Sequence, residues 1–201
     1  MRKLSAVVLM VTASVLLCQG LPAQEPATVK RSLVFTIVGQ PDKNLLNTVS
    51  SYAGLNCECT VRTCQQPKQQ GSTPEEEADQ LQRTLGSNDV LLVALLNVPE
   101  DITFRSYVSS SRRVAILNIW ALRPKVKLAG RTANEQYVGR VVKEAMCALG
   151  SLLGLDTCPD PRCAMSSWDS ETRLDAKGGN FCPPCLKKAQ KQLERAGVTM
   201  L

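Results

Sequence analysis

The segment from Lys143 to Cys158 reads K-E-A-M-C-A-L-G-S-L-L-G-L-D-T-C. Its apolar residues continue a spacing of three to four positions that begins near residue 134, which is typical of one face of a helix. We therefore predict a long helix over residues 134–153. The residues expected on its buried side are Val138, Val141, Val142, Ala145, Met146, Leu149, Leu152 and Leu153.

The same segment resembles the active-site helix of the metzincin zinc proteases, whose motif is H-E-x-x-H-x-x-G-x-x-H. In that motif two His residues one helical turn apart share a zinc ion with a third His, the Glu is the general base, and the Gly turns the chain. The matching ligand positions here hold Cys147, Ser151 and Thr157, the base position holds Ala148, and Gly154 is retained. The whole chain contains no histidine.

A series of cysteines downstream makes the resemblance more specific. Cys158 is followed by Cys163-Ala164-Met165 and later by Cys182-Pro-Pro-Cys185. This series is similar to the archaemetzincin signature, in which the third His is followed at once by Cys, then by C-x-M and C-x-x-C. The agreement is close over roughly the last third of the chain. It implies an α/β (α+β) fold: a metzincin-like single domain in which a mixed twisted sheet packs on the active-site-type helix, with a C-terminal Cys₄ zinc-site segment.

The resemblance also implies roles for individual residues. Cys158, Cys163, Cys182 and Cys185 match four thiolates that hold one structural zinc ion, and Met165 matches the Met turn beneath the catalytic metal. In an exported protein the same four cysteines could instead form two disulfides, and both interpretations stay open. We expect no catalytic metal, because Ser and Thr hydroxyls are poor zinc ligands and one Cys cannot hold the ion alone.

The N-terminus indicates export. Arg2 and Lys3 precede an uncharged apolar run over residues 4–17, and small residues follow near Gly20. This pattern is typical of a secretory signal peptide, and about fourteen apolar residues are too few to span a bilayer. We predict a signal peptide at 1–20, a polar lead-in at 21–30 and an archaemetzincin-like domain at 31–201. The mature chain is expected to be secreted and extracellular, without a membrane span.

Charge and composition exclude several other functions. Removing the signal lowers the formal net charge from +6 to +4, and aromatic residues make up only 4% of the chain. A nucleic-acid partner is therefore not expected. A cysteine protease needs a base beside its thiol, usually His, which this chain lacks. The C-x-x-C at Cys182 lies too near the C-terminus for a thioredoxin-like enzyme.

The remaining pattern predicts alternating strands and helices. The three cysteines at 57, 59 and 64 match no family motif. We expect Cys57 and Cys59 to lie on one face of a strand, where they could not easily form a disulfide with each other. Either could form a disulfide with Cys147. Alternatively, Cys147 is a free thiol in the core. The predicted strands are 32–38, 57–63, 89–96, 104–109 and 114–120, and the predicted helices are 43–52, 72–86, 134–153 and 183–195.

Three functions remain possible from the sequence. The first is a secreted archaemetzincin-like pseudoprotease, not an enzyme, that binds an unknown extracellular protein or peptide. The second is a secreted zinc metallopeptidase with a divergent ligand set that includes Cys147, Asp156 and Glu144. The third is a Cys-rich extracellular structural component.

Overall fold

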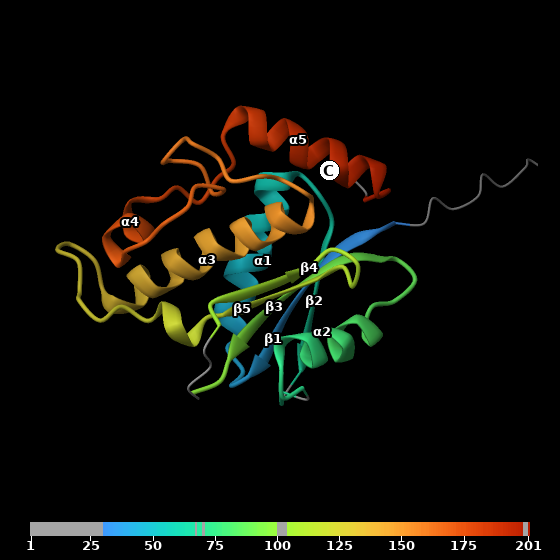
Figure 1. Ribbon diagram of the computed structural model, residues 1–201, viewed down its shortest axis with the longest axis horizontal. Coiled ribbons are helices and arrows are strands. Elements are labelled where there is room, and N and C mark those ends of the chain that lie inside the picture. The colour runs from blue at the N-terminus through green and yellow to red at the C-terminus, as the bar shows by residue number, and fades with distance from the viewer. Residues whose placement is uncertain (1–29, 67, 70, 100–103, 199–200) are drawn as a thin grey trace, which may run out of the picture.

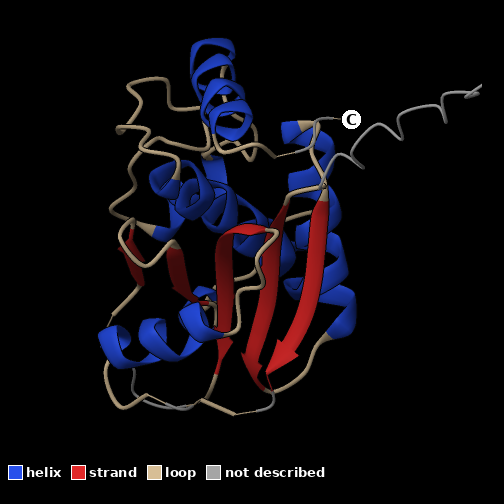
Figure 2. Cartoon of the chain, turned by 90° about the vertical axis from the view of Figure 1, so that its right-hand side faces the viewer, coloured by secondary structure: helices blue, strands red, loops and turns tan. Residues whose placement is uncertain are grey.

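The structure, a computed structural model, describes residues 30–66, 68–69, 71–99, 104–198 and 201. The predicted signal peptide at 1–20 and nearly all of the lead-in at 21–30 lie outside this part. The described strands form one sheet (Figure 2). Their order is β2-β1-β3-β5-β4, and only β4 runs antiparallel to its neighbour. The strands are β1 (Ser32–Gly39), β2 (Val61–Gln66), β3 (Asp89–Asn97), β4 (Ser106–Ser109) and β5 (Val114–Asn118).

Helices cover both faces of this sheet. Figure 1 shows α1 and α3 on one face and α2 on the other, with α4 and α5 in an outer layer beyond α3. The arrangement is a mixed α/β single domain, as predicted. The helices are α1 (Lys43–Cys57), α2 (Pro74–Arg83), α3 (Ala133–Leu152), α4 (Glu171–Ala176) and α5 (Pro183–Arg195), with a short 3₁₀ turn at Trp120–Leu122.

The centre of the sheet is buried on both sides. Every residue of β3 is buried, as its continuous apolar run predicted, because helices pack on both of its faces. Side chains alternate between two cores: Phe35 and Leu95 face α1 and α3, whereas Val34 and Leu92 face α2. The larger core lies beneath α3 and continues into the C-terminal segment, so it supports the candidate site directly.

The predicted strand at 57–63 is wrong at its beginning. Helix α1 continues to Cys57, and β2 begins only at Val61. The turn between them is made by Glu58 in the left-handed region, with φ 52°, while the backbone N–H of Cys59 donates to the carbonyl of Gly54. The apolar spacing of α1 extends through Ala53 to Cys57, and this helical period prevails over the short alternating pattern.

The expected separation of two cysteines is wrong for the same reason. Cys57 at the end of α1 and Cys59 after the left-handed turn are both buried, and their thiols contact each other. This contact together with burial raises the pKa of the Cys57 thiol. The argument for separation assumed a flat strand, and a helix end followed by a tight turn brings the two side chains together instead.

The long helix is confirmed at Ala133–Leu152. It begins with a capping box, in which the Thr132 hydroxyl accepts from the backbone N–H of Glu135 at 3.1 Å and the Glu135 carboxylate accepts from that of Thr132 at 2.6 Å. Within the part of the chain that the structure describes, neither α3 nor any other helix combines the length and apolar character needed to cross a membrane.

Candidate functional site

The residues that match the protease motif lie on α3 and on the loop after it, where Thr157 lines a surface pocket. The helix ends at Leu152, and Gly154 then adopts a φ of +74°, where the chain reverses. The backbone N–H of Leu155 donates to the carbonyl of Gly150 at 2.9 Å and closes this turn. The predicted turning role of Gly154 therefore has a direct conformational cause, and the turn leads the chain to Thr157.

The four residues at the motif positions have different surroundings. Cys147 is half-buried, and burial raises the pKa of its thiol. Ala148 is buried in the core, and the Ser151 hydroxyl donates to the backbone carbonyl of Cys147 at 3.0 Å. Thr157 is exposed and lines the pocket. The structure thus places Cys147 and Ser151 one turn apart on α3, as expected, with Thr157 on the loop beyond.

A lysine that the sequence analysis missed lies among these residues. The ammonium of Lys177 forms an ion pair of 2.7 Å with the carboxylate of Glu144, and both side chains are buried. The same ammonium lies against the Cys147 thiol, where its charge partly offsets the effect of burial on the pKa of that thiol. Lys177 is 33 positions from Glu144 in the sequence, so no local pattern could have indicated this pair.

A catalytic zinc ion of the family type does not fit these side chains in this arrangement. Such a site needs three protein ligands around an open position. Here a cation, the Lys177 ammonium, lies beside Cys147, and the hydroxyl of Ser151 is engaged with its own helix. Glu144, which we had considered as a possible ligand, is held by Lys177, and Asp156 is exposed on the loop.

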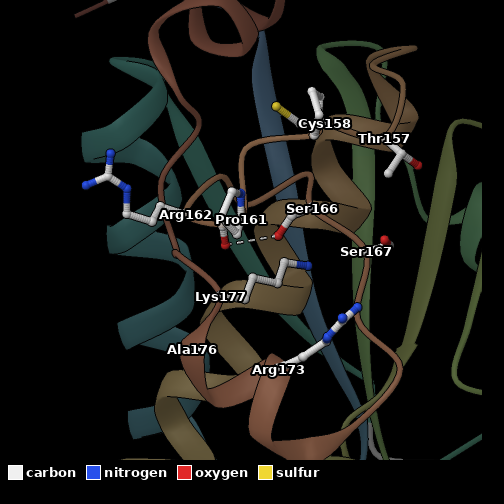
Figure 3. A pocket seen from close by; sticks show the side chains of 10 residues that line it. Thr157, Cys158, Pro161, Arg162, Ser166, Ser167, Arg173, Ala176 and Lys177 are labelled. Atoms are coloured by element: carbon white, nitrogen blue, oxygen red, sulfur yellow. Dashed lines mark hydrogen bonds between the residues drawn. The ribbon is translucent and has the colours of Figure 1, made fainter.

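The pocket next to these residues has a volume of about 780 Å³. Its walls come from the loop after α3 and from the segment that includes α4, and Figure 3 shows Lys177 and Arg173 reaching into it. A volume of this size falls within the range of ligand-binding clefts. Its lining residues are Thr157, Cys158, Pro159, Pro161, Arg162, Ser166, Ser167, Arg173, Ala176 and Lys177.

Helix α4 was not among the predicted helices. Ion pairs between side chains fix it to α3. Its Asp175 accepts from the Arg140 guanidinium at 2.6 and 2.7 Å, and Glu171 accepts from the same guanidinium at 3.0 Å. The Arg140 side chain is buried. Its hydrogen bonds hold the pKa of Asp175 below the ordinary value. The sequence signal for this helix was weak, because the helix has only six residues and mostly polar side chains.

The four C-terminal cysteines come together in space. The sulfur atoms of Cys158, Cys163, Cys182 and Cys185 all lie within 4.8 Å of one another, and Sγ of Cys158 is 3.6 Å from Sγ of Cys182. Four sulfurs at about 2.3 Å from a shared zinc ion would be roughly 3.8 Å apart, whereas a disulfide needs about 2.05 Å. The donor set and its spacing therefore fit a tetrahedral zinc site.

Backbone donors already point at these sulfurs. Sγ of Cys163 accepts from the backbone N–H groups of Met165, at 3.4 Å, and Cys182, at 3.3 Å. The backbone N–H of Cys185, at the start of α5, lowers the pKa of the Cys182 thiol. Such donors favour thiolate over thiol, which is the state that a zinc ion requires.

Met165, which the resemblance assigns to the Met turn, packs against α3. It is buried, and its sulfur packs against Gly150, where an added Cβ would lie 2.2 Å from Sδ. The backbone N–H of Cys158 donates to the carbonyl of Met165 at 2.9 Å. Gly150 therefore permits the cysteine-bearing loop to approach the helix.

Comparison with known proteins gives a consistent family. Residues 101–191 match the model of "Peptidase family M54". The chain is 37% identical over 87 residues to the archaemetzincin of Pyrococcus abyssi, covering 43% of this chain and 45% of that protein. It is 44% identical over 63 residues to that of Methanopyrus kandleri, covering 31% and 36%. The matched region thus spans less than half the length of these relatives.

Solved structures share the fold over a larger part of the chain. The crystal structure of archaemetzincin from Methanopyrus kandleri superposes with a TM-score of 0.62 and 21% identity, covering 85% of this chain and 99% of that one. A zinc-dependent peptidase from Methanocorpusculum labreanum gives a TM-score of 0.62 and 18% identity, covering 78% and 99%. The predicted fold class is confirmed.

These comparisons contradict the prediction that the chain is not an enzyme. The matching family is a peptidase family, and the structural neighbour from Methanocorpusculum labreanum is a zinc-dependent peptidase. The prediction rested on the residues at 147, 148, 151 and 157, and none of these comparisons supports the expectation of no catalytic metal. Over residues 101–191 the chain is similar to peptidase family M54, and it shares its fold with the archaemetzincin of Methanopyrus kandleri.

Proposed function

We propose that this chain is an exported archaemetzincin-like domain that acts on peptides or protein segments by binding them in the pocket beside α3. The observation that carries the proposal is the open pocket of about 780 Å³ at the end of the motif helix, bordered by Thr157 and Lys177. The peptidase relatives support a peptide as the ligand, because their family acts on peptide chains.

A single structural zinc ion at Cys158, Cys163, Cys182 and Cys185 belongs to this proposal. The cysteines join the loop that forms one wall of the pocket to the start of α5. A closed Cys₄ site performs no chemistry but stabilises the fold around it. Zinc would therefore hold the pocket wall in place without contacting the ligand.

Export is supported by the N-terminal sequence alone. The basic start at Arg2 and Lys3, the apolar run at 4–17 and the small residues near Gly20 fit a cleaved secretory signal. N-terminal sequencing of protein recovered from the medium of expressing cells tests this directly. A mature N-terminus near residue 21 is expected, and recovery of the intact chain only from inside the cells contradicts it.

Peptide binding is tested with a matched pair of variants. Ala176 is exposed and lines the pocket, so Ala176→Trp should fill it, whereas Ala121→Trp adds the same side chain at an exposed position outside the pocket. Binding of a fluorescent peptide library is measured by anisotropy. Loss of binding in Ala176→Trp alone supports the proposal, and equal binding by both variants contradicts it.

Peptide cleavage is the second candidate function, and the peptidase relatives favour it. The same peptides are incubated with the protein, with and without a zinc chelator, and the products are identified by mass spectrometry. Zinc content per chain is measured in parallel. Cleavage that the chelator abolishes and Ala176→Trp reduces would make the pocket the site of the reaction.

A further inference from the structure

We infer that the pocket beside α3 recognises a carboxylate, specifically the free C-terminal carboxylate of a bound peptide. This inference rests on the proposed peptide binding and adds the chemical group that is recognised. Two cationic side chains, those of Arg173 and Lys177, extend toward the pocket, and none of its lining residues is acidic.

Lys177 places a fixed positive charge at the inner end of the pocket. An ammonium has three N–H donors, and the Glu144 carboxylate at 2.7 Å takes one of them. The Cys147 thiol is a second neighbour of the ammonium, and the Lys177 side chain lines the inner end of the pocket (Figure 3). Because Lys177 is only 3% exposed, its position is set by its neighbours before any ligand arrives.

Arg173 provides a second cation that can move to a ligand. Its guanidinium pairs with Asp169 at 3.2 Å, but the two side chains are 69% and 70% exposed, so solvent screens this pair strongly. In Figure 3 Arg173 extends toward the same space as Lys177, whereas Arg162 points away from it. A guanidinium can bind a carboxylate through two parallel hydrogen bonds.

The two walls of the pocket are held together by close backbone packing. A Cβ on Gly178 would lie 1.7 Å from the carbonyl oxygen of Arg162, so only glycine lets these two segments approach. This contact holds Lys177, on one wall, close to Pro161 and Ser166 on the other. The hydroxyls of Ser166 and Ser167 add neutral polar groups near the two cations (Figure 3).

The size and lining of the pocket favour a peptide end over a small free anion. A volume of about 780 Å³ is far larger than one carboxylate requires. Pro159, Pro161 and Ala176 provide apolar surface beside the charged end, which suits the last side chains of a peptide. One end of the pocket would thus bind charge and the rest would bind apolar side chains.

The test uses two peptides of identical sequence that bind the protein, one ending in a free acid and one in an amide. We expect the acid to bind at least ~10-fold more tightly at pH 7 and low salt, because charge-assisted hydrogen bonds are stronger than neutral ones. Arg173→Gln should lower the affinity for the acid peptide to nearly that for the amide peptide. The affinity for the amide peptide should not change. Arg195→Gln, which removes an exposed cation outside the pocket lining, should leave the difference intact.

A second pair of measurements keeps the inference independent of folding. Lys177→Gln is made together with Glu144→Gln, so that neither buried partner is left as a lone charge, and melting curves check that this variant folds. Acetate is expected to compete with the acid peptide better than inorganic phosphate does. Equal binding of acid and amide, or a preference for phosphate, overturns the inference. Failure of both peptides to bind overturns the proposed function itself.

Discussion

The sheet of this protein and its C-terminal segment are stabilised by different kinds of contact. The sheet, from β1 to β5, is stabilised by apolar side chains buried on both faces. The segment after α3 shares the larger apolar core through residues such as Met165 and Phe181, and it is also fixed by the Arg140 ion pairs, the buried Lys177–Glu144 pair and the cysteine cluster. The pocket lies in this second region, so its shape depends on ion pairs and the cysteine cluster as well as on hydrophobic burial.

Removing the cysteine cluster should separate the two regions most strongly. Structural zinc contributes on the order of 10 kcal/mol to the folding of small zinc domains. We expect Cys163→Ser, or zinc removal by a chelator, to unfold residues 157–182 while the sheet stays folded. Hydrogen exchange resolved by peptide should show the loss of protection. Cys64→Ser, outside the cluster, is the control. A loss of protection spread evenly over the sheet and the C-terminal segment in both variants would contradict this difference between the two regions.

A core truncation should show the opposite pattern. Phe35 lies fully buried between the sheet and the α1 and α3 layer. Phe35→Ala is expected to cost about 3–5 kcal/mol in the free energy of unfolding of the whole domain, measured by urea denaturation. Phe35→Leu keeps most of the volume and should cost less. A large loss of stability confined to the C-terminal segment would contradict the expectation that Phe35 stabilises the whole domain through the core.

The contact between α3 and the cysteine-bearing loop allows a finer test. Gly150→Ala would place a methyl group 2.2 Å from Sδ of Met165 and 3.0 Å from the Phe181 ring, and should cost about 1–3 kcal/mol through overpacking. Gly139→Ala is the matched control on the same helix, because a Cβ there meets nothing within 4 Å and should stabilise by up to ~1 kcal/mol. Equal effects of the two substitutions on the melting temperature would refute this account.

The ion pairs of α4 should make the C-terminal region sensitive to acid. Hydrogen bonds from Arg140 lower the pKa of Asp175 from its ordinary value of 3.8. A depressed carboxyl pKa contributes stability that is present above the unfolded-state pKa and is lost as the pH falls through the folded-state pKa. We therefore expect stability to decrease as the pH falls below about 4.

Asp175→Asn identifies this contribution. The variant should lose roughly 1–3 kcal/mol at pH 7, because a charge-assisted hydrogen bond is removed from a largely buried guanidinium. Its free energy of unfolding, measured by urea denaturation, should also change less between pH 5 and pH 3 than that of the unmodified protein. Asp169→Asn, which breaks an exposed pair, should have almost no effect. Parallel pH curves for the Asp175 variant and the unmodified protein would exclude this role.

The sequence predicted the regions that depend on regular burial. The run at 89–96 and the apolar spacing of 134–153 both gave elements close to those observed, because burial imposes a period on the side chains. The error at 57–63 arose where two periods overlap, since an alternating stretch of three to four residues can also end a helix. The six-residue α4 escaped notice because its stability comes from ion pairs with α3.

The sequence by itself determined the family resemblance, the motif positions at 147, 148, 151 and 157, and the four cysteines that meet in space. These depend on spacing along one chain, which is visible in the order of residues. Only the tertiary structure decided that Lys177 pairs with Glu144 beside Cys147 and that a pocket opens between Thr157 and Arg173. The Lys177–Glu144 pair joins residues 33 positions apart, and both features depend on how the chain after α3 folds back against that helix.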